Sequence, residues 1–311
     1  MRIFTMCFLL CAATGCGLYS PSKDRYDRFS RGGFYSSGLA FDNDLDCLVI
    51  SSPASGRGDL WRISCDGKWA KPVFETPDNE VDPNSGTEGI LYFARSIDGR
   101  YQIFSRNLAT NVEAVVVSMS DSVTKPVASP DGTCLMFVRK PNGDPVSLSE
   151  IWQKNLLTGH FSRITDNLVY DGSVSFFRDS RRIVYYSDSD SEDIFVMDLT
   201  TRERKLICNG SLPSLSDDEE SILFVRRRAP SYNYDLWKRE IESGDEQSFE
   251  WEGGGGSVIQ AVQCLPGGRV AVICDLIPDR VGRLAILDTT TGEWISLPRL
   301  MNVVNLPEKI E

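Results

Sequence analysis

The feature of this sequence that most limits its possible folds is a six-fold internal repeat. Six segments align on an acidic or polar residue that is followed by an apolar pair, and successive segments begin 43, 48, 43, 42 and 48 residues apart. They begin at Asp59, Gln102, Glu150, Asp193, Asp235 and Arg283. A period of this length is that of a four-stranded propeller blade.

Each repeat has the same internal order. A short strand leads to a tight turn, such as Ser129-Pro130-Asp131-Gly132, and then to an apolar strand, such as residues 134–138. The aligned segment and a fourth strand follow. The middle strands are β-branched and aromatic at successive positions, which is typical of sheets covered on both faces. No helical periodicity lasts a dozen residues. The pattern predicts an all-β fold, a six-bladed β-propeller of four-stranded antiparallel blades, with a β-sandwich as the alternative.

The N-terminus has the character of an export signal. Arg2 precedes an apolar run over residues 3–13, which is too short to span a membrane and fits a secretory signal. Ala13-Thr14-Gly15-Cys16 resembles a bacterial lipobox, although Leu is usual where Ala13 stands. The resemblance implies that the chain is cleaved before Cys16 and that Cys16 is acylated, so that the protein would incorporate labelled palmitate. Gly17 is not the Asp that holds such lipoproteins at the inner membrane, which favours the outer membrane, facing the periplasm.

These observations divide the chain into four parts. Residues 1–15 are expected to be the lipoprotein signal peptide, and residues 16–37 the lipidated cysteine and a polar tether. Residues 38–305 are expected to form the propeller, and residues 306–311 a tail.

The third repeat, SPDGTCLMFVRK…SEIWQKNLLTGHFSRIT, resembles the repeat of the TolB-like, WD-repeat-like six-bladed propellers. The likeness extends over about residues 38 to 300. The second repeat departs from it, with Asn84-Ser85-Gly86-Thr87 in place of the SPDG turn. TolB itself has a sizeable domain before its propeller, and here a short tether stands there, so the resemblance is to a relative and not to TolB.

Composition and motifs argue against several chemistries. The chain has 33 Lys and Arg against 44 Asp and Glu, so nucleic acid is a poor partner. Its one histidine, His160, stands beside Gly159 in a predicted turn, and we interpret it as a surface residue. No G-x-S-x-G nucleophile motif occurs. We therefore expect no enzyme, no cofactor and no metal.

Two charged loops before third strands suggest a binding face. Asp188 and Asp190 lie in the loop of the fourth repeat, where a solvated loop is favoured over a calcium site because the Gly and distal Glu of a calcium loop are absent. The matching loop of the fifth repeat carries cations and aromatics, which dominate interface energetics: Arg226, Arg227, Arg228, Tyr232 and Tyr234. Their alternative roles are mutual ion pairing and ordinary solvated hairpins.

The six cysteines beyond Cys16 permit 15 pairings. Cys47 and Cys65 flank one predicted hairpin at nearly equal distances from its centre, so we predict a disulfide between them. The other four are interpreted as buried free thiols.

The function predicted from these features is that of a lipid-anchored periplasmic binding or scaffold protein of the cell envelope, without catalysis. The family resemblance implies an envelope protein or a peptidoglycan-associated partner. The alternative is a propeller-type enzyme, or a carbohydrate- or peptide-binding protein, that uses carboxylates around the channel.

Overall fold

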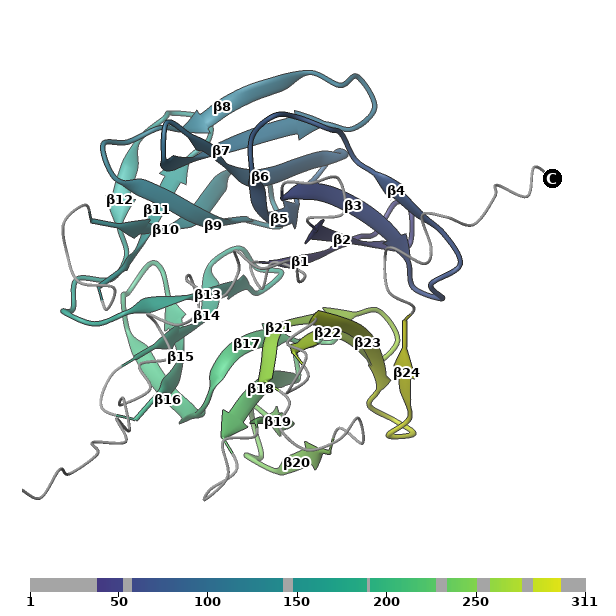
Figure 1. The fold of residues 1–311 in the computed structure, drawn as a ribbon. Helices are drawn as coiled ribbons and strands as arrows, with labels where there is room; N and C mark the ends of the chain where they lie inside the picture. The colour runs from purple at the N-terminus through teal and green to yellow at the C-terminus, as the bar shows by residue number, and fades with distance from the viewer. Residues whose placement is uncertain are drawn as a thin grey trace, which may run out of the picture.

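The computed structural model describes residues 38–52, 58–141, 148–188, 191–227, 234–250, 258–275 and 282–297. These residues form six four-stranded antiparallel sheets, each built from four consecutive strands, as the repeat predicts. The sheets are arranged as the blades of a propeller (Figure 1). Blades one to three contain β1 (Leu39–Asp42), β2 (Cys47–Ser52), β3 (Asp59–Ser64), β4 (Ala70–Pro72), β5 (Glu80–Ser85), β6 (Ile90–Ile97), β7 (Arg100–Asn107), β8 (Glu113–Val117), β9 (Ser122–Ala128), β10 (Cys134–Lys140), β11 (Glu150–Asn155) and β12 (Phe161–Arg163). Blades four to six contain β13 (Asp171–Phe176), β14 (Arg182–Ser187), β15 (Asp193–Asp198), β16 (Arg204–Asn209), β17 (Ser211–Leu215), β18 (Ser221–Arg227), β19 (Tyr234–Glu240), β20 (Glu246–Phe249), β21 (Val258–Leu265), β22 (Arg269–Asp275), β23 (Gly282–Asp288) and β24 (Trp294–Ser296).

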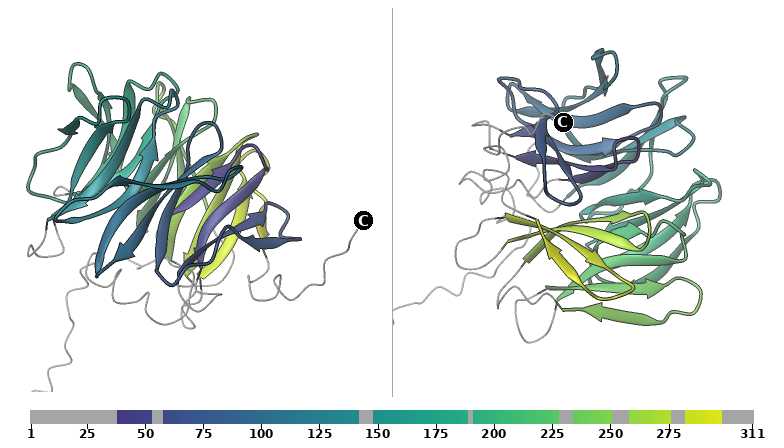
Figure 2. Two further views of the ribbon diagram at one scale, coloured as in Figure 1. Left: turned by 90° about the horizontal axis from the view of Figure 1, so that it is seen from above. Right: turned by 90° about the vertical axis from the view of Figure 1, so that its right-hand side faces the viewer.

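The first strand of every blade lies at the centre of the ring. Each of these strands contacts the first strand of the next blade, and β21 contacts β1, which closes the circle. Among the described strands none is exchanged at the closure, because blades one and six are each made of contiguous chain. A buried apolar cluster joins them instead: it includes Leu39, Ile50 and Trp61 of blade one with Ile273 and Leu297 at the end of blade six. Figure 2 shows the two blades, purple and yellow, side by side.

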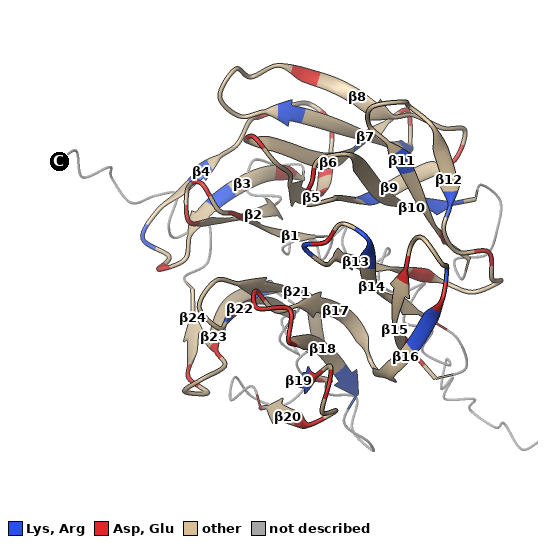
Figure 3. Cartoon of the chain, turned by 180° about the vertical axis from the view of Figure 1, so that it is seen from behind, with Lys and Arg blue, Asp and Glu red and all other residues tan. Residues whose placement is uncertain are grey.

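Antiparallel order gives the ring two distinct faces. The turns between first and second strands, and between third and fourth strands, lie on one face, here called the turn face. The loops between second and third strands, and the connections between blades, lie on the other, here called the loop face. Figure 3 shows acidic residues on many of the turns. No helix long and apolar enough to cross a membrane occurs within the described part of the chain.

Side-chain hydrogen bonds explain why the turns recur. Asn107, Asn155, Asp198 and Asp288 end the third strands of four blades, and each accepts hydrogen bonds from backbone N–H groups two and three residues later. This is the Asx-turn, which a short polar side chain forms with its own backbone. The repeat in the sequence is therefore a repeat of turn chemistry as well as of apolar strands.

An arginine at the end of the second strand reinforces three blades. The guanidinium carbons of Arg95, Arg139 and Arg226 lie 4.6, 5.1 and 4.8 Å from the ring centres of the aromatic residues in the adjacent third strands. Those residues are Phe104, Trp152 and Trp237, the aromatic positions of the aligned segments. Each arginine also forms an ion pair with a carboxylate of its own blade or its own blade connection.

Candidate functional site: the central channel

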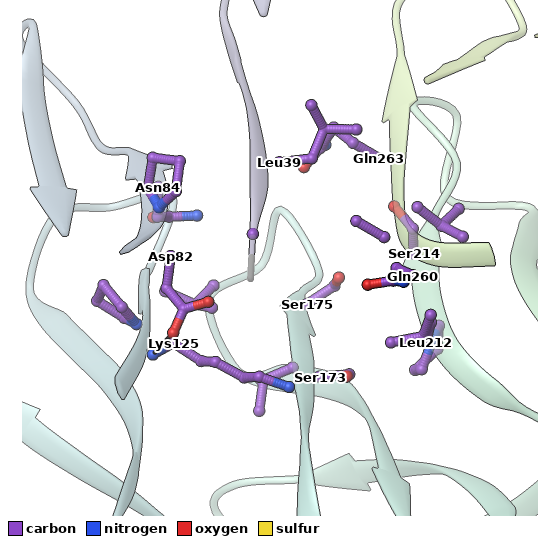
Figure 4. Close-up of a pocket in the computed structure, with 18 residues that line it drawn as sticks. Leu39, Asp82, Asn84, Lys125, Ser173, Ser175, Leu212, Ser214, Gln260 and Gln263 are labelled. Atoms are coloured by element: carbon purple, nitrogen blue, oxygen red, sulfur yellow. Dashed lines mark hydrogen bonds between the residues drawn. The ribbon is translucent and has the colours of Figure 1, made fainter. Parts of the chain in front are cut away.

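The six first strands enclose a cavity of about 130 Å³ on the axis of the ring. On the same measure one water needs roughly 10–15 Å³, so the space holds several waters or one small group. Every blade contributes between two and four residues, and the lining includes both short polar and apolar side chains (Figure 4). The charged residues among those that line it are Asp82 and Lys125.

Irregular backbone places these residues at the cavity. The register of the first strand against the second shifts in blades two to five, between Val81 and Asn84 in blade two and at equivalent positions in the next three. The bulged residues with positive φ are Asp82 (53°), Lys125 (52°), Ser173 (51°) and Leu212 (53°). A left-handed conformation is uncommon for such residues and costs of order 1–3 kcal/mol each. Bulges of this kind re-aim side chains and are frequent beside functional sites.

The Asp82 carboxylate is buried and only half satisfied. Asp82 is only 4% exposed. Oδ2 accepts a hydrogen bond of 3.1 Å from the backbone N–H of Lys125, whereas Oδ1 has no hydrogen-bond partner. Figure 4 shows the carboxylate turned toward the interior of the cavity. Burial raises the pKa of Asp82, and the positive charge of Lys125 opposes that rise.

The Lys125 side chain reaches the loop-face mouth of the cavity. Its Nζ donates a hydrogen bond of 2.9 Å to the Tyr170 hydroxyl and lies 5.6 Å from the centre of the Tyr170 ring. The two charged groups of the channel therefore form no direct side-chain ion pair with each other. Each presents hydrogen-bonding capacity to the space between them.

Lys125 contacts the connection that leads into blade four. Tyr170 lies in the connection that leads into blade four, and its carbonyl accepts a hydrogen bond of 2.7 Å from the N–H of Asp188. Asp188 is exposed, and Leu168 in the same connection is 85% exposed. We call Leu168, Tyr170 and Asp188 the mouth cluster. It combines an apolar, an aromatic and an acidic residue, of which Tyr170 contacts Lys125 of the channel lining.

The predicted binding residues that the structure describes differ in their exposure and contacts. Asp188 is exposed in the mouth cluster, as its loop position predicts, and Arg227 is exposed while Tyr234 is half-buried. Arg226 lies between blades: Nε donates to the carbonyl of Asn209 at 3.0 Å, and Nη1 pairs with Glu246 at 2.7 Å. Its described ion pair is with Glu246, on the outer strand of its own blade.

Several predicted positions lie outside the described residues. These are the signal peptide, Cys16 and the tether, Asp190, Arg228, Tyr232 and the tail at 306–311. The expectations attached to them stay predictions.

Cys47 and Cys65, for which the sequence predicts a disulfide, are not bonded to each other in the structure. Both residues are free thiols. Cys47 lies opposite Ser64 in the β2–β3 register, so Cys65 is one residue out of line. A shift of one residue turns a side chain to the other face of the sheet, and Cys65 packs against the cluster between blades one and six. Burial raises the pKa of Cys47 to about 12. Cys134, Cys208 and Cys264 are free thiols as well, and Cys274 is fully buried.

Other chemistry-bearing residues do not converge within the described residues. His160 is exposed in the turn between β11 and β12, as predicted. No group of three or more His, Cys, Asp or Glu in the described ranges could hold a metal ion. The residues that sequence reasoning missed are Asp82 and Lys125. Their available signal was a proline after each, at Pro83 and Pro126, inside a strand where proline marks a bulge or an edge.

No family model matches the sequence, and no curated protein matches it either. Solved structures do match. TolB from Acinetobacter baumannii superposes with a TM-score of 0.68 at 22% identity, over 88% of this chain and 67% of that one. A putative TolB from Agrobacterium tumefaciens gives 0.64 at 17% identity, over 77% and 88%. The fold is that of the TolB-like six-bladed propellers.

The same TolB-like fold also carries enzymes. An oligogalacturonate lyase, solved in complex with manganese, matches with a TM-score of 0.61 at 14% identity, over 86% of this chain and 77% of that one. A puromycin-hydrolyzing peptidase from Mycobacterium tuberculosis gives 0.63 at 14% identity, over 90% of this chain and 55% of that one. Identities this low establish the fold alone, and function has to be argued from the site.

Proposed function

We propose that this chain is a binding or scaffold protein of the bacterial cell envelope, held in the outer membrane by lipid on Cys16, that engages a protein partner at the loop-face mouth of its channel without turnover. The observation that carries the proposal is the mouth cluster beside Lys125. Leu168 is 85% exposed there, next to an aromatic residue held in place by Lys125. An apolar anchor with an aromatic neighbour on a rigid scaffold is the usual core of a recognition surface.

Binding fits the channel better than catalysis does. Glycoside hydrolysis, for example, typically uses two carboxylates that flank the bond. Asp82 is the one carboxylate among the described residues that line the cavity. The enzyme alternative keeps one specific support, because a carboxyl with a raised pKa in a cavity is the profile of a general acid.

The partner proposal is tested with a pair of leucines in the same region of the chain. Leu168→Asp adds a charge to the mouth cluster, whereas Leu157→Asp makes the same change on the turn face, where Leu157 is 80% exposed. Both should fold normally, because exposed substitutions change stability little. Crosslinking in intact envelopes should recover the wild-type partner with Leu157→Asp and lose it with Leu168→Asp. Equal recovery from both variants contradicts binding at this mouth.

The anchor and the absence of turnover have their own tests. Cys16→Ser should abolish incorporation of labelled palmitate, and a wild-type chain that takes up no label refutes the anchor. Incubation with oligogalacturonate and with aminoacyl-peptide substrates should give no product. A measurable rate that disappears in Asp82→Asn establishes the enzyme alternative in place of this proposal.

A further inference from the structure

The channel holds a buried carboxylate of which the fold uses one oxygen and leaves the other without a hydrogen bond. Asp82 Oδ1 has no hydrogen-bond partner, although the residue is 4% exposed. Leaving a buried acceptor unsatisfied is unfavourable, and more so when the group is charged. The residue is also held in a left-handed conformation (φ 53°), which is uncommon for non-glycine residues, although aspartate adopts it more often than most. Local rules are broken in this way chiefly where a site needs the residue.

The opposite charge of the channel stands on the neighbouring blade. The described contacts of Lys125 Nζ use one hydrogen bond, to the Tyr170 hydroxyl, and an ammonium has three donors. Figure 4 shows the side chain extending across the opening toward Ser173. Hydroxyls and amides of Asn84, Ser175 and Gln260 complete the polar part of the wall. The cavity thus offers one acceptor charge and one donor charge, with no net charge between them.

We propose that the channel is a binding site for a small zwitterion, in which Asp82 Oδ1 receives an ammonium group and Lys125 Nζ receives a carboxylate. A bare cation fits less well, because Lys125 would repel it. A bare anion would meet the uncompensated Asp82. A cavity of about 130 Å³ suits a molecule the size of a free amino acid. This inference goes beyond the proposed function, since it concerns a small ligand inside the ring and not the protein partner on its face.

The test uses purified full-length chain and free amino acids as probes. Titration calorimetry with glycine and with alanine should show binding, whereas acetate and methylammonium, which carry one charge each, should bind at least tenfold more weakly, as expected for loss of one charged hydrogen bond. The amino acids should also raise the melting temperature in proportion to ln(1 + [L]/Kd).

Three variants locate the site. Asp82→Asn keeps the shape of the side chain and Lys125→Met keeps its length, and each should weaken amino-acid binding about tenfold or more. Asp98→Asn is the matched control: Asp98 is an exposed turn residue that is also left-handed (φ 50°), and its variant should bind as the wild type does. Because two separate variants probe the site, a folding defect in one leaves the other decisive.

Four outcomes overturn the proposal. One is no binding of either amino acid at about 50 mM, roughly fifty times a Kd of about 1 mM. Another is binding that both folded variants retain. A third is equal binding of acetate or methylammonium, and the last is a response to CaCl₂ but not to amino acids, which would assign the channel to a metal ion. Loss of the protein partner in the leucine test leaves these outcomes unaffected, so the two proposals fail separately.

Discussion

Replacing Arg95 by methionine should destabilise the propeller more than any change at an exposed arginine. The Arg95 side chain is 9% exposed, and its Nε lies 2.7 Å from Oε1 of Glu80, whose side chain is fully buried. The same guanidinium pairs with Glu113 at 2.5 Å. Its carbon also lies 5.2 Å from the centre of the Phe93 ring. One cation therefore compensates a buried carboxylate and fills an aromatic pocket.

The magnitude follows from what the substitution leaves behind. Methionine replaces the apolar stem, so the main loss is the charge opposite Glu80. Breaking a buried pair by removing one partner costs about 3–5 kcal/mol. Each kcal/mol shifts the melting temperature of a large domain by about 2–4 °C, so a drop of roughly 6–20 °C is expected. Burial already raises the pKa of Glu80, and the variant should raise it further.

Urea unfolding of three variants separates this explanation from general damage. The double variant Arg95→Met with Glu80→Gln should recover most of the lost stability, because glutamine leaves no unpaired buried charge. Arg182→Met is the control, since Arg182 lies 4.2 Å from the Phe177 ring centre but its side chain is 46% exposed, and it should cost under about 1 kcal/mol. The reasoning is refuted by a loss below about 1 kcal/mol for Arg95→Met, or by no recovery in the double variant.

Three further predictions concern the channel and the cysteines of the β2–β3 hairpin. Asp82→Asn should stabilise the fold by about 1–3 kcal/mol at neutral pH. Because the pKa of Asp82 in the folded state lies above its ordinary 3.8, the stability of the wild type falls as the pH rises from the unfolded-state pKa to the folded-state pKa, and the advantage of the variant in urea unfolding should vanish below about pH 4. An advantage that is the same at all pH values contradicts this. Gly38→Ala should destabilise by about 1–3 kcal/mol or more in thermal melts, since Gly38 has φ 88° and an added Cβ would stand 2.5 Å from the Asp82 Cα; an unchanged melting temperature contradicts the close approach. Without reductant, peptide mapping after maleimide labelling should find Cys65 modified well before Cys47, whose pKa is raised to about 12; two unmodified, linked peptides would restore the disulfide.

The sequence was sufficient for the blades because the information lies in local patterns. The third strands begin at the aligned residues or within two positions of them, from Asp59 to Arg283. Apolar strands and self-bonding turn residues such as Asn155 act over a few residues, so they can be read without knowing the fold. The register of the β2–β3 hairpin could not be predicted in this way. The length of the loop between β2 and β3 does not fix which residues lie opposite each other. Ser64, and not Cys65, lies opposite Cys47.

The channel could not be predicted because it depends on irregularities in short strands. Asp82 reads as a polar residue in a weak strand, and only the bulge in the ring turns it inward. Arg226 shows the same limit on the outside. Beside Arg227 and Arg228 it resembles a solvated basic loop, but it closes on Glu246 and on Trp237. Both cases depend on contacts between segments that are distant in the sequence.

The closure of the ring by packing alone makes each blade a separable length of chain. Leu39 and Leu297, near the two ends of the described propeller, belong to the same apolar cluster. A peptide linker between them would give a circle, and cutting that circle at any connection between blades would give a circularly permuted protein with the same channel. Duplication or loss of one repeat, a single event in the gene, changes the ring by one whole blade. The unit that folds is thus also a unit that evolution can copy, move or remove.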